Sequence, residues 1–182
     1  MKKIPMLFKY DKDFNVTKEV NPDCQWVFDG YGKATRKWDG TACLIKDGKL
    51  YKRRTIKAED INDQKYINLV LAQWWQVDRL DGKFYGWMPI ENNDKWHHEA
   101  YDPSLPDGTY ELIGPKIQGN AEYSGKHLLV SHLNTVYCNV ARTWDGLIKF
   151  FDGYDIEGLV FYHPDGRMAK IRKHDLGLRR KK

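Results

Sequence analysis

The sequence predicts an α+β protein made mainly of antiparallel β-sheets, with a few helices flanking them. Three observations carry this prediction. Asp-Gly occurs eight times in the 182 residues. Asp-Gly between apolar runs is the strongest short signal for a β-hairpin, because type I′ turns need positive φ at both central residues. The apolar runs between these turns have the length of strands, and segments with helical spacing are few.

The expected strands are the apolar runs that the turn signals bound. The Asp-Gly pairs lie at 29–30, 39–40, 47–48, 81–82, 107–108, 145–146, 152–153 and 165–166. The strands are expected at 34–38, 41–46, 49–56, 84–90, 109–113, 127–133, 156–162 and 167–173. Strands this short that are joined by tight turns pair with their neighbours, so an antiparallel arrangement follows.

Two segments predict helices. Segment 62–77 carries apolar residues on one helical face, at Ile67, Val70, Leu71 and Trp74. Segment 143–151 begins with a threonine that suits the N-cap position. Hydrophobic residues make up 41% of the chain, enough for one substantial core. Because the strand pattern continues along the whole length, we expect a single domain at 1–182.

The charge balance is modest. Lys and Arg number 30 against 25 Asp and Glu, a net charge of +5, so both signs are mixed over the chain. The clearest asymmetry is the C-terminal stretch "KIRKHDLGLRRKK", with seven basic residues and one acid. Such a tail, from about 174 to 182, either contacts phosphates or is solvated, and composition alone favours the second reading.

Cysteine usage and hydropathy predict a cytoplasmic protein, in the host cytoplasm if its origin is viral. The three cysteines are widely spaced and form no CxxC, which argues for a reducing compartment and against a disulfide framework or a zinc site. The apolar run near the N-terminus is too short for a signal peptide. No run approaches 18 apolar residues, so we expect no membrane span.

Lys37 is the first candidate for chemistry. It lies in the expected strand 34–38, two residues ahead of the turn at 39–40, in the string "KWDG". A buried ammonium is costly unless the site needs it. Since Asp-Gly is frequent here as a turn, a lone Lys-x-Asp-Gly is a weak signal.

Four further stretches strengthen the case. They are "YKRRTIK" with Arg54, "DGTYELIGPKIQGN" with Glu111, "DIEGLVFYHPDG" with Glu157, and "RMAKIRKHDLGL" with Lys170 and Arg172. Each has a structural alternative. The arginine could be an exposed strand cation, the glutamates could cap or pair locally, and the last two basic residues could be a solvated edge that deters aggregation.

Taken in order, these stretches resemble the motifs of the covalent nucleotidyltransferases, the superfamily of ATP-dependent ligases and RNA capping enzymes. Lys37 to Gly40 is similar to the nucleophile motif Lys-x-Asp-Gly, and Glu157-Gly158 to the Glu-Gly-hydrophobic motif. Lys170-Ile171-Arg172 resembles the final Lys-x-Lys motif, with Arg in place of the second Lys. The resemblance implies an ATP-grasp-like nucleotidyltransferase fold.

Within the superfamily, "ELIGPKIQGN", "HLLVSH", "ATRKWDGTA" and "KFYGWMPI" look like the RNA ligases. The nearest group is that of small stand-alone 5′–3′ RNA ligases, which consist of an adenylyltransferase domain alone. The sequence offers no segment for the OB domain of DNA ligases and capping enzymes. We therefore expect a single adenylyltransferase domain.

The resemblance implies a three-step reaction. A lysine, Lys37, attacks the α-phosphate of ATP and releases pyrophosphate; the AMP then passes to a 5′-phosphate of RNA; a 3′-hydroxyl finally expels AMP. Lys170 and Arg172 would bind the α-phosphate, and their positive field would favour the neutral amine of the nucleophile. Mg²⁺ or Mn²⁺ would assist, with Glu157 as the candidate carboxylate ligand.

The same resemblance places further residues around the nucleotide. Glu111 would bind the ribose hydroxyls, and Arg54 would contact ribose or the incoming 5′-phosphate. Asp39 would orient the turn or lie near the nucleotide, beside Gly40. Exposed aromatic residues could stack on RNA bases, although packing in the core is the more frequent fate of such side chains. The candidates are Trp74, Trp75, Trp96 and Tyr101.

Two other readings stay open at this point. One is another enzyme of the superfamily, a GTP-using capping guanylyltransferase or a DNA ligase core. The other is a nucleic-acid-binding module that keeps the fold without catalysis. The expected partner is RNA with 5′-phosphate and 3′-hydroxyl ends, with no membrane and no obligate protein partner.

Overall fold

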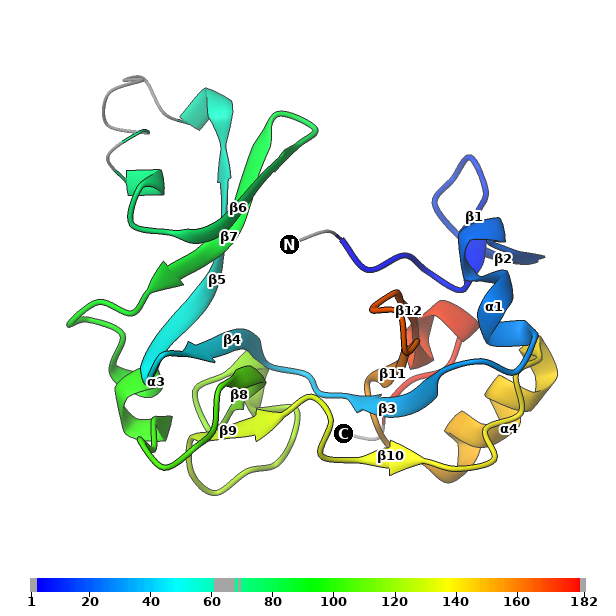
Figure 1. The fold of residues 1–182 in the computed structure, drawn as a ribbon. Coiled ribbons are helices and arrows are strands. Elements are labelled where there is room, and N and C mark those ends of the chain that lie inside the picture. Colours follow the sequence, from blue (N-terminus) through cyan, green and yellow to red (C-terminus); the bar gives the residue numbers. More distant parts are fainter. Residues whose placement is uncertain (1–2, 61–67, 69, 181–182) are drawn as a thin grey trace. The chain divides into compact units, whose positions relative to one another are not determined.

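The computed structural model describes residues 3–60, 68 and 70–180 of the chain (Figure 1). They form two compact units. The central unit holds residues 39–131, and the terminal unit holds residues 3–38 together with 132–182. Both are α+β, with mostly antiparallel strands and short helices, so the predicted fold class is confirmed. The expectation of a single domain stays a prediction.

The central unit is built on a six-stranded antiparallel sheet in the order β6-β7-β5-β4-β8-β9. Its strands are β4 Thr41–Lys46, β5 Lys49–Lys57, β6 Trp75–Leu80, β7 Lys83–Pro89, β8 Gly108–Ile113 and β9 Leu128–Ser131. One face packs on apolar residues that include Ile45, Leu112 and Ala100. Ala100 ends the short helix α3, Lys95–Ala100, so this helix lies on the same face as the core.

Two Asp-Gly pairs make the hairpins that the sequence predicts. Asp47 and Gly48 have φ of 51° and 66°, and Asp81 and Gly82 have φ of 49° and 67°. Positive φ at both central residues is the type I′ conformation, whose twist matches that of the strands it joins. These turns connect β4 to β5 and β6 to β7.

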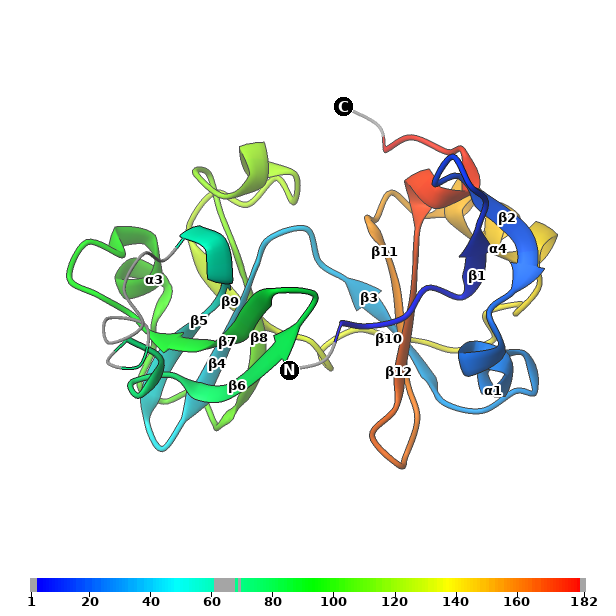
Figure 2. The same cartoon turned by 90° about the horizontal axis from the view of Figure 1, so that it is seen from above.

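The terminal unit is built on a four-stranded antiparallel sheet in the order β10-β3-β11-β12. Its strands are β3 Lys33–Lys37, β10 Val136–Tyr137, β11 Gly158–Tyr162 and β12 Met168–Arg172. Strands β11 and β12 form a hairpin and run side by side in Figure 2. A smaller pair, β1 Phe8–Tyr10 with β2 Val16–Val20, lies in the same unit, and a short helix α1, Gln25–Phe28, follows it.

The N-terminal segment extends this sheet at β12. Met6 makes a parallel bridge with Lys170, and two backbone hydrogen bonds of 2.9 Å fix it there. The amide of Leu7 donates to the carbonyl of Lys170, and the amide of Lys170 donates to the carbonyl of Pro5. Segments from the two ends of the chain therefore share one sheet.

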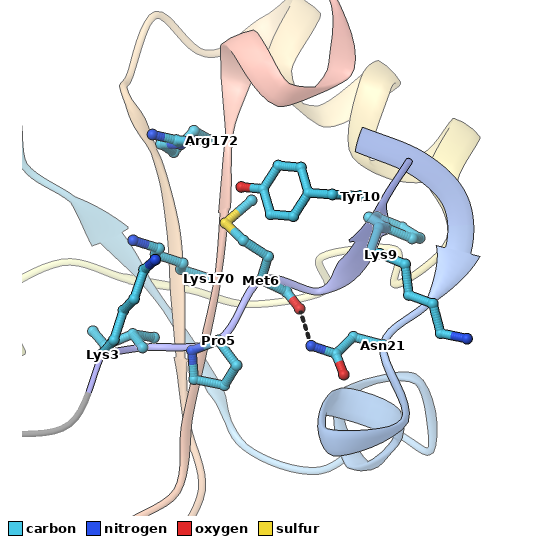
Figure 3. Close-up of a pocket in the computed structure, with 10 residues that line it drawn as sticks. Lys3, Pro5, Met6, Lys9, Tyr10, Asn21, Lys170 and Arg172 are labelled. Carbon is cyan, nitrogen blue, oxygen red and sulfur yellow. Dashed lines mark hydrogen bonds between the residues drawn. The ribbon is translucent and has the colours of Figure 1, made fainter. Parts of the chain in front are cut away.

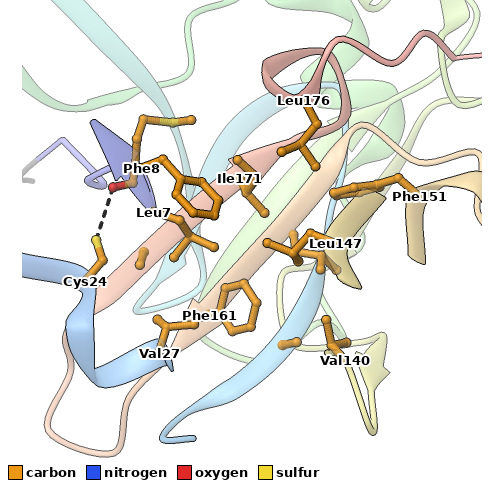
Figure 4. Packing of buried hydrophobic residues seen from close by; sticks show 14 of the residues in the cluster. Leu7, Phe8, Cys24, Val27, Val140, Leu147, Phe151, Phe161, Ile171 and Leu176 are labelled. Atoms are coloured by element: carbon orange, nitrogen blue, oxygen red, sulfur yellow. Dashed lines mark hydrogen bonds between the residues drawn. The ribbon is translucent and has the colours of Figure 1, made fainter. Parts of the chain in front are cut away.

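One face of the terminal sheet is closed by a hydrophobic core (Figure 4). Helix α4, Trp144–Gly153, begins at the N-cap Thr143, whose side chain accepts a hydrogen bond from the Gly146 amide. Its buried residues Leu147 and Phe151 belong to the same cluster as Phe161 and Ile171 of the sheet. Each such side chain contributes roughly 1.5–3 kcal/mol when fully buried.

The predicted strands are confirmed, and their observed ends lie within two residues of the predicted ones. The helix prediction at 143–151 is confirmed by α4. The Asp-Gly pairs at 145–146 and 152–153 were expected as turns, and this is wrong, because both lie inside that helix. Asp145 occupies the first turn, where an acid interacts favourably with the helix dipole. Residue 146 has to be glycine, because a Cβ there would lie 2.6 Å from Cβ of Ala141.

The helix predicted at 62–77 is wrong at its C-terminal end. Residues 68, 70 and 71 are helical, residues 62–67 and 69 lie outside the described part, and Trp75–Leu80 is strand β6. Pairing with β7 overrides the helical pattern of apolar residues there. Within the described residues, no helix is long and apolar enough to span a membrane.

Candidate active site

Four of the predicted residues meet at one end of the terminal sheet. Lys37, the last residue of β3, pairs with Gly158 of β11, and Gly158 pairs on its other side with Arg172 of β12. The next row of paired residues whose side chains share this face holds Thr35, Val160 and Lys170. Side chains alternate between the faces of a strand.

Because Ala34, Leu159, Phe161 and Ile171 point into the core, the side chains of Lys37, Lys170 and Arg172 share the opposite face. We call this the cationic face. Gly158 stands between Lys37 and Arg172 in their row, so no side chain separates the two cations across β11.

Lys37 is held by Glu157. The Nζ of Lys37 lies 2.5 Å from Oε2 of Glu157, and the two side chains are 24% and 19% exposed. Glu157 comes directly before β11, so the strand pairing brings it beside the end of β3. A charge-assisted hydrogen bond of this kind fixes the direction of a long, flexible side chain. The nucleophile motif and the Glu-Gly motif therefore form one contact.

Lys170 carries its charge in an unfavourable place. Burial lowers its pKa, and the neighbouring cations Lys37, Arg172 and Lys3 lower it further, while Glu157 opposes the shift. No ion pair to Lys170 occurs among the described residues. A desolvated cation surrounded by like charges costs free energy in the free protein, and an anion bound there would relieve that cost.

Arg172 is positioned by Asp175. Its Nε and Nη2 donate to the carboxylate of Asp175 at 2.8–3.1 Å, and Asp175 also accepts from the Arg172 amide. This hydrogen-bonded pair raises the pKa of Arg172, so its charge is permanent at any working pH. Asp175 is only 2% exposed, so the pair is rigid, and Nη1 is the guanidinium nitrogen that it does not engage.

Gly158 cannot carry a side chain. A Cβ at this position would lie 2.3 Å from the carbonyl oxygen of Ile171 and 2.9 Å from Cα of Arg172. Since both atoms belong to the backbone of β12, neither can move aside cheaply. The glycine of the Glu-Gly motif thus permits the close approach of β11 and β12 that sets the spacing of the cationic face.

The cationic face has the chemistry of a phosphate site. It offers two ammonium groups and a guanidinium, the side chains that bind phosphate most often. Its carboxylate, Glu157, is an oxygen ligand of the kind that Mg²⁺ and Mn²⁺ prefer. No group of three or more His, Cys, Asp or Glu side chains suited to a metal is found within the described ranges.

The motif that begins at Lys37 continues into the central unit. The amide of Asp39 donates to Oε1 of Glu122 at 2.9 Å. Gly40 packs against β8, where a Cβ would lie 2.2 Å from the carbonyl oxygen of Leu112 and 2.8 Å from Cγ of Glu111. The motif glycine is therefore required by this close contact. The nucleotide-binding roles of Asp39, Gly40 and Glu111 stay predictions.

The register of the central sheet separates the two neighbouring arginines. Lys52 pairs with Cys43, a core residue, so Arg54 lies with Lys52 on the core face. Arg53 lies on the other face, the one that carries Glu111, because Glu111 pairs with Ala42 and both alternate with core residues. The Nε of Arg53 is buried without a hydrogen-bond partner among the described residues. Arg54 and Glu111 are thus not brought together, the role predicted for Arg54 stays a prediction, and Arg53 is a further candidate that the sequence prediction did not name.

The aromatic candidates for RNA stacking are mostly used for packing. Trp74 is 7% exposed. Trp96 stacks on His127 at 4.5 Å, and the hydroxyl of Tyr101 donates to the carbonyl of Gly48 at 2.6 Å. Trp75 is partly exposed in β6. Of these four, Trp75 is the one whose ring is engaged least in the core.

Comparison with known proteins finds relatives that share one name. No family model matches the chain. The chain is 29% identical to RNA ligase 1 of Rattus norvegicus over 218 aligned positions, which cover 80% of this chain and 67% of that protein. It is 29% identical to RNA ligase 1 of Pongo abelii and 28% identical to that of Mus musculus, in each case over 54% of this chain. These two alignments span 42% of the relatives' own length.

Proposed function

We propose that this protein is an ATP-dependent RNA ligase that joins 5′-phosphate and 3′-hydroxyl ends through a lysyl-AMP intermediate. The observation that carries the proposal is the cationic face, where Lys37 pairs with Glu157 beside Lys170 and Arg172. The similarity to proteins named RNA ligase 1 supports the choice of RNA as substrate.

In the first step Lys37 acts as nucleophile toward the α-phosphate of ATP. Its nitrogen forms a bond to the α-phosphorus, and the bond from that phosphorus to the bridging oxygen breaks. The leaving pyrophosphate takes the electron pair, and Glu157, already hydrogen-bonded to the amine, is placed to accept the proton. Lys170 and Arg172 would balance the negative charge of the phosphate in the transition state.

The remaining steps use the same face. An oxygen of the RNA 5′-phosphate attacks the phosphorus of lysyl-AMP, the phosphorus–nitrogen bond breaks, and Lys37 recovers its proton. The oxygen of a 3′-hydroxyl then attacks the activated 5′-phosphorus and its proton passes to solvent, while the bond from that phosphorus to the bridging oxygen breaks and AMP leaves with the electron pair. Because these transfers need little covalent chemistry from the protein, positioning and charge stabilisation account for most of the catalysis.

We expect a divalent metal ion to assist at the phosphates of ATP, with Glu157 as the candidate residue that would bind it. Bound Mg²⁺ or Mn²⁺ would supply further positive charge to the phosphate oxygens. The protein's own part is to orient Lys37 and to hold Lys170 and Arg172 on one face.

The test is covalent labelling. The protein is incubated with ATP labelled at the α-phosphorus, denatured and resolved, and a parallel sample receives labelled GTP. We expect label from ATP alone, loss of the label in Lys37→Ala, and a mass increase of one AMP on the peptide that contains Lys37. Labelled protein is then mixed with 5′-phosphorylated RNA, which should release the label, whereas 5′-hydroxyl RNA should not.

Other outcomes would assign the site differently. Label from GTP would indicate capping-type guanylyl transfer, and transfer to nicked DNA in preference to RNA would indicate a DNA ligase. Absence of label, together with RNA binding that survives Lys37→Ala, would indicate a non-catalytic binding module and would refute the proposal.

A further inference from the structure

The terminal unit contains a cavity of about 590 Å³ next to the cationic face (Figure 3). One wall is the edge strand β12, which contributes Lys170 and Arg172. The other walls come from the N-terminal segment, from β1 and from the residue that follows β2. Their lining residues are Lys3, Ile4, Pro5, Met6, Phe8, Lys9, Tyr10 and Asn21.

The charge inside the cavity is positive. No Asp or Glu lines it, whereas Lys3, Lys170 and Arg172 do. Figure 3 shows the side-chain nitrogens of Lys3 and Lys170 turned toward one another, and these two lysines repel electrostatically. Lys9 contributes little to this charge, since its ammonium pairs with Glu19 and points away from the other cations. Lys3, Lys170 and Arg172 therefore gather there, and of these Arg172 has its charge partly balanced by Asp175, which does not line the cavity.

The position of the cavity relative to Lys37 follows from the sheet. Lys37, Gly158 and Arg172 form one row across β3, β11 and β12. Neighbouring strands lie roughly 4.8 Å apart, so β12 is roughly 10 Å from β3 and the N-terminal segment is one strand further. The cavity lies beyond β12, at the end of the row away from Lys37.

Phosphoryl-type transfer places the attacking and leaving atoms in line, on opposite sides of the phosphorus. A phosphorus held over Gly158 by Lys170 and Arg172 would have Lys37 on one side and the cavity on the other. In the first step the group opposite Lys37 is the departing pyrophosphate. In the second step Lys37 is the leaving group, and the group opposite is the attacking 5′-phosphate of RNA.

We propose that this cavity is the phosphate site for the group in line opposite Lys37, with Lys3 of the N-terminal segment as a third ligand beside Lys170 and Arg172. The inference rests on the proposed function. Its ligand is a phosphate that comes from two sources in turn, the pyrophosphate part of ATP and the 5′-phosphate of RNA. The burial of Met6 in the core and its bridge to Lys170 fix the segment that carries Lys3.

The variant Lys3→Ala tests the proposal, with Lys12→Ala as the matched control. Lys12 is an exposed lysine of the same N-terminal region that does not line the cavity. The first measurement is the rate of self-adenylylation at varied ATP, with pyrophosphate as inhibitor. The second is a single-turnover transfer of AMP from isolated enzyme–AMP to 5′-phosphorylated RNA. Circular dichroism and thermal unfolding show that each variant is folded.

In Lys3→Ala we expect about a tenfold loss in at least one measurement, the effect of removing one charge-assisted hydrogen bond. A higher Michaelis constant for ATP with weaker pyrophosphate inhibition assigns the cavity to pyrophosphate. Slower transfer to RNA assigns it to the 5′-phosphate. Restoration by Lys3→Arg supports a charge contact over a packing effect.

Equal behaviour of Lys3→Ala and Lys12→Ala in both measurements would overturn the inference and leave the proposed function intact. If the unmodified protein itself took no label from ATP, the proposed function would fail first. The two failures are therefore distinguishable.

Discussion

Lys52 in the central unit and Lys170 in the terminal unit are both at least partly shielded from water, and they differ in what surrounds them. In the central unit, Lys52 is 7% exposed and its ammonium lies 2.6–2.8 Å from both carboxylate oxygens of Asp94 and 3.0 Å from Glu91. Burial alone would raise the pKa of Asp94, but hydrogen bonds from the Glu91 amide and from Lys52 outweigh it and lower the pKa. The charge of Lys52 is thus balanced by carboxylates of its own unit.

In the terminal unit, Lys170 is half-buried among cations. Burial and then Lys37, Arg172 and Lys3 lower its pKa, and Glu157 alone opposes them. The comparison teaches that burial of a charge does not by itself indicate function. A buried cation with matched carboxylates stabilises the fold, whereas one among like charges costs stability and is explained by a ligand of opposite charge.

The largest expected effect is on activity at Lys170. In Lys170→Met we expect self-adenylylation to fall by about 100-fold, because one fixed positive group that stabilises the transition state is lost. The free energy of unfolding should stay the same or rise, since a desolvated cation is replaced by an apolar chain of similar length. Single-turnover labelling and urea unfolding measure the two quantities. A large loss of stability would show that Lys170 is a structural residue like Lys52.

The opposite result is expected at Lys52. In Lys52→Met we expect the free energy of unfolding to fall by about 2 kcal/mol, because Asp94 and Glu91 lose a charged partner. Self-adenylylation per folded molecule should be unchanged. Urea titration gives the stability, and labelling at low temperature gives the activity. Loss of labelling without loss of stability would contradict the distinction between the two lysines.

The arginines of β5 sharpen the comparison within the central unit. Arg53 is a partly buried cation whose Nε has no hydrogen-bond partner in the described part of the chain, so it should behave as a ligand-binding residue. We expect Arg53→Ala to slow either labelling by ATP or transfer to RNA about tenfold, and Arg54→Ala to have a smaller effect. Labelling by ATP and transfer of AMP to RNA are measured for both variants. A larger effect in Arg54→Ala than in Arg53→Ala would support the assignment made from the sequence.

The smallest expected effect is a shift in pH dependence. Because its pKa is lowered, Lys170 loses its proton at a lower pH than an ordinary lysine. Labelling should therefore decline on the alkaline side as phosphate binding weakens. Lys170→Arg keeps the charge, so its decline in labelling should begin at a higher pH.

The free energy of unfolding depends on pH with the opposite sign. Between the lowered pKa and 10.5 the unfolded chain binds the extra proton, so stability rises with pH in that window.

The fold was largely predictable because local turn chemistry determines it. Asp47-Gly48 and Asp81-Gly82 adopt the conformation that their residue types favour, and the strands beside them follow. The failures have separate causes. Asp145-Gly146 lies in a helix that Thr143 caps, and residue 146 is glycine because Ala141 leaves no space for a side chain there. Trp75–Leu80 is a strand because β7 pairs with it, and the spacing of apolar residues within the segment does not indicate that partner.

The candidate site was predictable where a motif lies within a few residues. Lys37, Glu157, Lys170 and Arg172 were named from short strings; strand register brings the three cations to one face, and Glu157 joins them through its contact with Lys37. The sequence prediction names Arg54, whereas the register places Arg53 on the face of Glu111, and local sequence does not determine a register that differs by one residue. Lys3 could not be found either, since its place depends on a bridge between the two ends of the chain, and no motif marks it.

The bridge between Met6 and Lys170 also bears on when this sheet can form during synthesis. Glu157 follows Lys37 by 120 residues along the chain, so β3 leaves the ribosome well before its partner β11. Closing so long a loop is slow and has to follow the synthesis of β11 and β12. Under the proposed function, a nascent chain that ends before β11 lacks the partner of Lys37 and should take no label from ATP.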